Sequence, residues 1–270
     1  MDSAQAFARR SWISMKAWGF DPIQTLGRAK SVGRVRADRK RIIEQKAQSS
    51  DSSLFPLASS FVVTEEWRDE GGVASGHYFH QDLIVARDIF KSNPKRHIDV
   101  GSRVDGFVAH VAAFREIEVM DVRQINAEVS GIVFHQQDLM YLNPEWRASA
   151  DSVSCLHALE HFGLGRYGDP IDFDGWRRGL ANLQELLVPG GTLYLSVPTG
   201  MQQRIEFNAH RVFSIPFLRS VLSQTMDIQN VDFVLDNGDL LSSIDLDSQA
   251  ALNSFNARYG CSIWKLKKPE

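Results

Sequence analysis

HIDVGSRVDGF, residues 97–107, is the stretch of sequence that decides the fold. Its first four residues are typical of a short buried strand, and Gly101 follows directly at the end of that strand. A glycine at this point lets the backbone turn tightly and approach a ligand. In an open parallel sheet, ligands bind at the carboxyl ends of the strands, near the point where the strand order reverses. We therefore expect this stretch to be the first strand of such a sheet and to carry a binding site.

Strands and helices alternate on both sides of this stretch. Apolar residues recur on one face over residues 77–92, which indicates a helix before the first strand. Further helices are expected at about 107–114, 175–187 and 215–222, with a short one around 247–255, and further strands at 116–120, 131–135, 151–156, 192–197, 231–235 and 261–266. This alternation predicts an α/β fold with a doubly wound, mostly parallel sheet of seven strands.

The charge is unevenly distributed along the 270 residues. Residues 1–50 carry eleven Lys and Arg against four Asp and Glu, although the whole chain has a formal net charge of −3. We therefore expect a basic, mostly helical N-terminal extension and linker over residues 1–53, followed by the main domain over residues 54–270. A basic arm can seek phosphates or anionic lipid, or it can pack on the body or on a second subunit and so form a homo-oligomer. Aromatic and basic residues are too sparse for a nucleic-acid-binding module.

The two cysteines and the hydropathy indicate the compartment. Cys155 and Cys261 make no disulfide framework, and Cys155 lies in an apolar run typical of a buried strand. The N-terminus interleaves basic and aromatic residues, unlike a signal peptide, and no apolar run reaches the length of a membrane span. We expect a cytoplasmic protein without a transmembrane segment.

Three acidic residues stand at related places in the predicted sheet. Asp99 precedes the glycine turn, Asp121 ends the second strand, and Asp138 follows the third. A carboxylate at the end of the second strand can accept both hydroxyls of a ribose. Taken singly, each acid is more often a turn residue or a helix cap. Arg103 occupies the position where a dinucleotide-binding turn needs a second glycine, which disfavours a nicotinamide-dependent oxidoreductase.

Several of these segments resemble class I S-adenosylmethionine-dependent methyltransferases. The acid–x–Gly pattern at residues 99–101, LHALEHF at residues 156–162 and LVPGGTL at residues 187–193 occur in the order and spacing of that superfamily. Segments 78–83, 99–106, 160–169 and 206–211 are most similar to an uncharacterised methyltransferase-like domain family. The resemblance covers about residues 77–200 and implies a Rossmann-like fold that binds S-adenosyl-L-methionine. Arg103 and Asp105 stand where the superfamily turn has further glycines.

The resemblance also implies which residues contact the cofactor. The turn lies against its amino-acid part, Asp121 accepts its ribose hydroxyls and Asp138 contacts its adenine amino group. Arg103 either pairs with the cofactor carboxylate or forms a surface pair with a nearby Asp. The complete set expected to bind the cofactor is Asp99, Gly101, Ser102, Arg103, Asp121, Asp138 and His157.

Methylation of a hydroxyl leaves one proton to remove, and histidine is the usual general base near neutral pH. His210 and His161 are the candidates for that role, although each is about as typical of a hydrogen-bonded structural histidine. His157 and His161 are four residues apart and share a face if the segment is helical, which suits a metal pair. The chain has no His-Glu-x-x-His arrangement and no cysteine ligand set, so we expect no metal.

The residues around these histidines suggest an acceptor site. Those expected to bind the acceptor are Arg166, Tyr167, Glu206, Asn208 and Arg211. The favoured function is O-methylation of a saccharide or another small hydroxylated molecule, such as a step in polysaccharide biosynthesis. The alternative is a non-catalytic partner or regulatory protein that binds S-adenosylmethionine and uses its basic arm as an interaction surface.

Overall fold

The structure is a computed structural model that describes residues 22–58, 63, 67 and 71–270. The chain divides into two compact units between Val73 and Ala74, whereas the expected boundary lay between residues 53 and 54. In the first unit, helix α2 spans Pro22–Ala47, where the sequence predicted helix. Most of its side chains from residue 31 onward are exposed. The part of the predicted extension at residues 1–21 lies outside the described residues.

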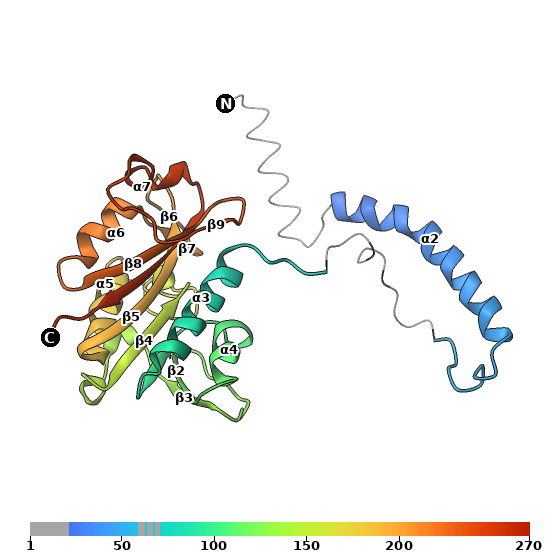
Figure 1. Ribbon diagram of the computed structural model, residues 1–270, viewed down its shortest axis with the longest axis horizontal. Helices are drawn as coiled ribbons and strands as arrows, with labels where there is room; N and C mark the ends of the chain where they lie inside the picture. The colour runs from blue at the N-terminus through green and yellow to red at the C-terminus, as the bar shows by residue number, and fades with distance from the viewer. Residues whose placement is uncertain (1–21, 59–62, 64–66, 68–70) are drawn as a thin grey trace. The chain divides into compact units, whose positions relative to one another are not determined.

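The second unit is built on one eight-stranded sheet (Figure 1). Its strands lie in the order β3-β2-β1-β4-β5-β10-β8-β9. The strands are β1 His97–Val100, β2 Ile117–Asp121, β3 Ile132–Gln136, β4 Ala150–Leu156, β5 Leu187–Thr199, β8 Asp227–Val234, β9 Leu240–Leu241 and β10 Gly260–Lys267. Strands β1 to β5 run parallel, and β10 lies antiparallel between β5 and β8. The mostly parallel sheet is confirmed, and the two-residue edge strand β9 adds to the seven strands predicted.

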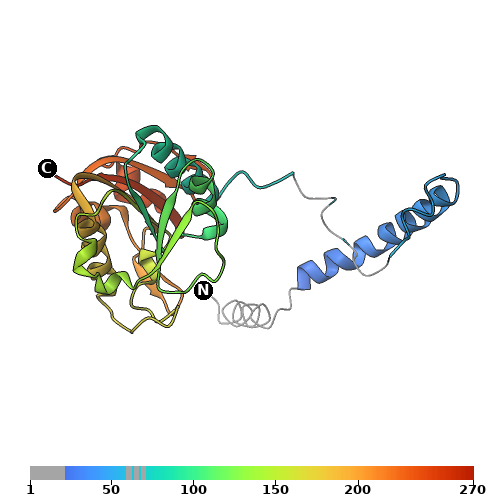
Figure 2. The ribbon, with the colours of Figure 1, turned by 90° about the horizontal axis from the view of Figure 1, so that it is seen from below.

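Helices cover both faces of this sheet (Figures 1 and 2). Helices α3, His77–Ser92, and α4, Ala109–Ala112, pack on one face, and α5, Gly175–Leu186, and α6, Ile215–Leu222, pack on the other. Alternate residues of β2 enter opposite core clusters, because successive side chains of a strand point to opposite faces: Ile117 and Val119 join one cluster and Met120 joins the other. The resulting three-layer α/β arrangement is the predicted fold class.

Two local predictions differ from the structure. The helix expected at 107–114 is a π-helical turn, Val104–Val108, followed by the single turn of α4. The strand expected from residue 192 begins at Leu187, so the Pro-Gly-Gly segment does not separate helix from strand; its pairing with β4 shifts register between Ala150 and Ser152. That irregularity accommodates Gly190, whose φ of 72° is in the left-handed region.

Several short elements connect the strands and helices of the second unit. They are the helical turns Leu139–Tyr141, Pro144–Trp146, Leu159–His161 and Ser254–Asn256, helix α7 Gln249–Leu252, and the antiparallel hairpin of β6 Arg204–Glu206 with β7 His210–Val212. The β6–β7 hairpin was not predicted, since each of its strands has only three residues. Among the described residues, none of the helices is both long and apolar enough to cross a membrane.

Candidate cofactor and acceptor site

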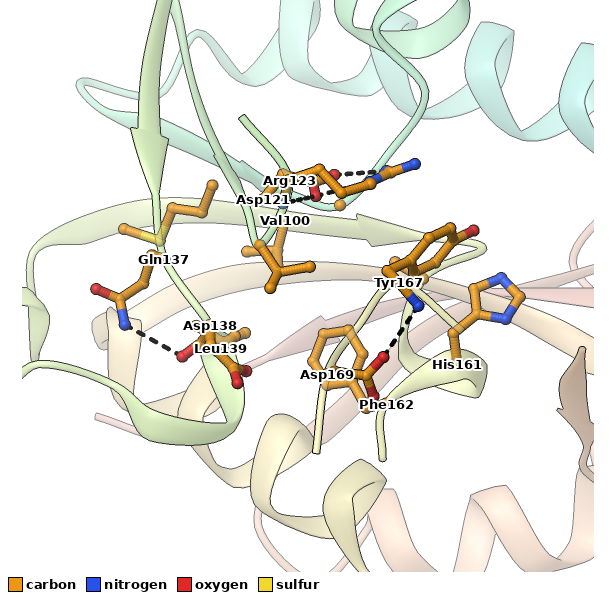
Figure 3. A pocket seen from close by; sticks show the side chains of 14 residues that line it. Val100, Asp121, Arg123, Gln137, Asp138, Leu139, His161, Phe162, Tyr167 and Asp169 are labelled. Atoms are coloured by element: carbon orange, nitrogen blue, oxygen red, sulfur yellow. Dashed lines mark hydrogen bonds and ion pairs between the residues drawn. The ribbon is translucent and has the colours of Figure 1, made fainter. Parts of the chain in front are cut away.

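A cavity lies at the carboxyl ends of β1, β2 and β3 (Figure 3). The open space that it encloses, together with the solvent at its mouth, is about 500 Å³. The strand order reverses between β1 and β4 beside it, the position at which open α/β sheets bind ligands. Its walls are formed by Val100, Gly101, Met120, Asp121, Val122, Arg123, Gln137, Asp138, Leu139, Ala158, His161, Phe162, Tyr167 and Asp169.

Gly101 forms the wall of the cavity at the end of β1. Its φ of 72° lies in the left-handed region, where a side chain is strained. A Cβ atom at this position would lie 2.9 Å from the Cβ of Ala158, closer than such atoms approach in proteins. Both the backbone angle and the close approach of the β4 segment therefore require glycine here.

Asp99 holds this turn from behind the cavity wall. Its carboxylate is buried and accepts hydrogen bonds from the Ser102 amide at 3.1 Å, the Ser102 hydroxyl at 2.6 Å and the Ser154 hydroxyl at 2.5 Å. Burial raises the pKa of Asp99 to about 6, because these hydrogen bonds compensate only in part for the loss of water. Asp99 and Ser102 are absent from the cavity walls. The sequence analysis expected both to contact the ligand directly, whereas in the structure they shape the turn.

Asp121 lies in the cavity wall at the end of β2, as the ribose assignment requires. Its carboxylate accepts two hydrogen bonds from the guanidinium of Arg123, at 2.9 and 2.6 Å, and one from the Arg123 amide at 2.8 Å. The guanidinium carbon of Arg123 lies 4.3 Å from the ring centre of Tyr167. Figure 3 shows the ion pair at the cavity wall. A hydroxylated ligand that binds Asp121 must therefore compete with Arg123.

Asp138 lies in the wall after β3. One of its carboxylate oxygens accepts a hydrogen bond from the Met140 amide at 2.9 Å, which caps the short helical turn that begins at Leu139. Asp138 therefore both caps a helical turn, a common role of acids at such positions, and forms part of the cavity wall.

Arg103 points away from the cavity walls. Its guanidinium forms an exposed, two-contact ion pair with Asp105, at 3.1 and 2.7 Å, and lies 5.3 Å from the ring centre of Tyr78. Of the two arrangements considered from the sequence, the structure therefore has the surface pair with Asp105.

The segment after β4 contributes His161, Tyr167 and Asp169 to the opposite wall. His161 Nδ1 lies 2.6 Å from the carbonyl oxygen of Ala209, and its ring meets the ring of Tyr167 edge-on. Asp169 accepts hydrogen bonds from backbone amides of its own loop, which fixes the Tyr167 backbone (Figure 3). Burial lowers the pKa of His161, so its imidazole is neutral and retains a proton-accepting nitrogen.

His157 and Glu160 form a buried pair next to this wall. His157 Nδ1 lies 2.9 Å from Glu160 Oε1, and His161 Nε2 lies 3.7 Å from the same oxygen. Burial alone would raise the pKa of Glu160, but the attraction and hydrogen bond of His157, together with the attraction of His161, lower it overall. His157 has a φ of 53° and precedes the Leu159–His161 turn, so His157 and His161 do not share a helix face. His157 is not part of the cavity wall.

The remaining candidates on the hairpin lie outside the cavity walls. His210 is half-buried, with its ring centre 4.9 Å from that of Tyr259, and burial lowers its pKa. Glu206 is exposed and pairs with Arg204 at 2.6 Å, and Asn208 is exposed. Arg166 donates to the carbonyl oxygen of Ala209 at 2.8 Å, which ties the hairpin to the segment after β4.

Arg211 is buried and serves the loop between β4 and α5. Its guanidinium donates to the backbone carbonyls of Phe162 at 2.6 Å, Phe173 at 3.0 Å and Glu160 at 3.3 Å. Because these bonds occupy the guanidinium inside the protein, the side chain orders the loop, whereas the sequence analysis expected it to bind an acceptor.

Sequence comparison assigns the chain to a family. A family model described as "Caenorhabditis protein of unknown function, DUF268" matches residues 110–251, just over half of the chain. The chain belongs to the DUF268 family. No curated protein sequence matches it.

Two solved structures similar to this DUF268 chain are methyltransferases. The 1,6-didemethyltoxoflavin-N1-methyltransferase of Burkholderia thailandensis, crystallised with 1,6-didemethyltoxoflavin and S-adenosylhomocysteine, has a TM-score of 0.50 and 15% identity over 70% of this chain and 79% of its own. The N-methyltransferase NodS of Bradyrhizobium japonicum has a TM-score of 0.49 and 13% identity over 73% of this chain and 100% of its own. The DUF268 chain therefore has the class I methyltransferase fold, as the sequence predicted.

Of the predicted site residues, the fold brings Gly101, Asp121, Asp138, His161 and Tyr167 to one cavity. Sequence reasoning missed Arg123, Gln137, Phe162 and Asp169. Arg123 carried a usable signal, because it lies two residues after the acid that ends β2 and a side chain of that length can reach back to a carboxylate. Asp169 carried a weaker one, its place at the end of a glycine-rich segment.

The raised pKa of Asp99 predicts a pH-dependent stability. The neutral carboxyl contributes about 3 kcal/mol to the free energy of unfolding. This contribution is fully present below about pH 4 and is lost as the pH rises through about 6. In Asp99→Asn the amide cannot ionise, and the hydroxyls of Ser102 and Ser154 can turn to accept from it. The free energy of unfolding of the wild type relative to this variant should therefore increase between about pH 8 and about pH 5. Urea unfolding at both values measures it, and parallel pH profiles of the two proteins would contradict the assignment.

A second prediction concerns the loop held by Arg211. Replacement Arg211→Met leaves buried carbonyls without donors and should reduce the free energy of unfolding by about 2–4 kcal/mol. Exposed Arg103 provides the matched control, since Arg103→Met should change it by less than about 0.5 kcal/mol. Chemical denaturation measures both. Limited proteolysis should cut the Arg211 variant sooner within residues 162–174, and equal losses in the two variants would refute this role.

Proposed function

We propose that the protein is an S-adenosylmethionine-dependent methyltransferase that methylates a hydroxyl of a saccharide or another small molecule. The observation that carries this proposal is the convergence of Gly101, Asp121 and Asp138 on one cavity, at the ends of three successive parallel strands of a class I methyltransferase fold. The similar methyltransferase of Burkholderia thailandensis was crystallised with S-adenosylhomocysteine, the demethylated product of the same cofactor.

The residues of the cavity fit this cofactor. The left-handed turn at Gly101 exposes backbone without a side chain, which allows the amino-acid part of the cofactor to approach closely. The Asp121 carboxylate, once released by Arg123, can accept both ribose hydroxyls, and Asp138 lies farther along the same wall. The apolar side chains of Val100, Leu139 and Phe162 line the same cavity and suit the faces of a purine ring.

When bound, S-adenosylmethionine supplies a sulfonium methyl group, and the protein must then orient the acceptor and remove its proton. His161 is the candidate base in the cavity wall. Its Nδ1 is used by the carbonyl oxygen of Ala209, so Nε2 is the proton-accepting atom. Glu160 lies 3.7 Å from that Nε2, and its negative charge would stabilise the imidazolium formed when the proton is taken up.

His210 is the alternative base. Its Nε2 is buried and has no hydrogen-bond partner among the described residues, and its ring stands on the hairpin strand next to Ala209. It lies outside the cavity walls, whereas His161 forms part of them, and we therefore assign the proton to His161. Tyr167 and Arg166, on the loop that follows His161, are proposed to meet the acceptor.

The cofactor assignment predicts the effect of removing one carboxylate. Asp121→Ala should weaken binding of S-adenosylmethionine and S-adenosylhomocysteine by about 10- to 100-fold, because two hydrogen bonds to a charged group are lost. Asp105→Ala is the matched control: Asp105 also pairs with the Arg two residues away, but it does not line the cavity. Calorimetric titration of the full chain measures both variants. Wild-type protein that binds neither compound would overturn the function itself, and equal affinity in wild type and Asp121→Ala would overturn the ribose contact.

The base assignment predicts a split between turnover and binding. With a panel of saccharides and other hydroxylated acceptors, release of S-adenosylhomocysteine reports turnover. His161→Gln should lower kcat by about 100- to 10,000-fold and change cofactor affinity by less than about 10-fold. Exposed His110, on α4, is the control, and His110→Gln should leave both unchanged. Loss of turnover in His210→Gln with retained turnover in His161→Gln would assign the proton to His210 instead.

A further inference from the structure

Three side chains that are distant in the sequence meet at the carboxyl edge of the sheet. His77 is the first residue of α3, His157 follows β4, and Cys261 is the second residue of β10. One potential ligand atom from each lies within 4.8 Å of the other two. None of the three forms part of the cavity wall described above. They form a group of two imidazoles and one thiol, which we call the His–His–Cys cluster.

The most buried histidine of the cluster has an unused nitrogen. His157 is 7% exposed, and its Nδ1 is engaged by Glu160. Its Nε2 is buried and makes no hydrogen bond to a described residue, an arrangement that is costly in a protein interior. Cys261 is fully buried; its thiol makes a weak 3.8 Å contact with a backbone carbonyl and also interacts with the side chain of His157. The thiol of Cys261 is therefore the described group that faces the otherwise unpartnered Nε2 of His157.

The surroundings of His157 match a known feature of metal sites. A metal-bound histidine almost always gives its other ring nitrogen to a carboxylate or carbonyl, which fixes the ring and raises its basicity. Glu160 is 1% exposed and holds Nδ1 at 2.9 Å, so that Nε2 is the atom left for a metal. Two imidazole nitrogens and one thiolate are a donor set that suits Zn²⁺, with a fourth position open to water.

Metal binding requires the three ligand atoms, which lie within 4.8 Å of one another, to move closer together. Tetrahedral Zn²⁺ with bonds of the usual length places its ligand atoms about 3.3–3.8 Å apart. The rings of His77 and His157 are nearly parallel, at an interplanar angle of 8° with centres 5.1 Å apart. The rings must turn out of this parallel arrangement for both nitrogens to face one ion, and His77, which is only half-buried and begins its helix, is the ring with room to turn.

We propose that His77, His157 and Cys261 bind one Zn²⁺ ion. The ion joins the start of α3, the segment after β4 and the central strand β10. The same segment carries His161 into the cavity wall, and Glu160 lies between His157 and His161. Zn²⁺ therefore acts on the candidate base only by positioning it, through His157 and Glu160. This proposal departs from the sequence-based expectation that the protein has no metal.

Cobalt is the probe that tests the site, because Co²⁺ takes the same tetrahedral geometry and a bound thiolate adds a near-ultraviolet charge-transfer band. The full chain is stripped with a chelator, titrated with Co²⁺ and then with Zn²⁺. The expected result is saturation at one Co²⁺ per chain, a charge-transfer band, and loss of that band when Zn²⁺ displaces the cobalt. No band and no binding of either metal would overturn the proposal.

Two variants identify the ligands. Cys261→Ser should abolish the charge-transfer band, whereas Cys155→Ser should retain it, since Cys155 is equally buried but lies outside the cluster. Should Cys261→Ser fail to fold, His77→Ala decides the question because His77 is partly exposed: it should keep its circular dichroism spectrum and bind Zn²⁺ at least 10-fold more weakly. Unchanged zinc affinity in folded His77→Ala, or an unchanged band in Cys261→Ser, would refute the site. Calorimetry with S-adenosylhomocysteine on the same samples tests the proposed cofactor separately.

Discussion

The buried carboxylate of Asp99 is the interaction on which the binding edge of the sheet depends. It accepts from both the amide and the hydroxyl of Ser102, and from the hydroxyl of Ser154 on the neighbouring strand β4. The Ser102 hydroxyl in turn accepts from the Leu156 amide. These bonds join β1 to β4 just where the two strands part. The gap between them, which Gly101 lines, therefore has a fixed width before any ligand arrives.

Charged side chains order the segment between β4 and α5, which has little regular secondary structure. The chain between β4 and α5 has only one short helical turn, so many of its backbone groups lack a partner within the segment. Arg211 supplies donors to its carbonyls from one side, and Asp169 accepts from its amides on the other. Such bonds to charged groups are stronger than neutral ones. This explains how a glycine-rich loop can hold Tyr167 in a defined position at the cavity.

The alternation of strands and helices and the mostly parallel sheet followed from the sequence, because hydrophobic periodicity and glycine turns are local signals. Asp121 and Asp138 were predicted at the cavity for the same reason: each directly follows a strand. The direction in which a side chain points at such an end is not local. Asp99 turns inward because Ser154 of β4 lies beside it, and Arg103 turns outward because Asp105 pairs with it. The His–His–Cys cluster had no spacing motif at all, since only the insertion of β10 beside β5 brings Cys261 near His157.

The central place of β10 also governs the order in which this protein can be completed during synthesis. Gly260 comes 61 residues after Thr199, yet β10 is the strand that pairs with β5 and connects β8 and β9 to the sheet. Until the ribosome has released residues 260–267, β5 presents an unpaired edge with buried-type side chains such as Leu193, Leu195 and Val197. An exposed apolar edge of this kind invites pairing with other chains. The β5 edge therefore remains open to such pairing until residues 260–267 have been made and have joined the sheet.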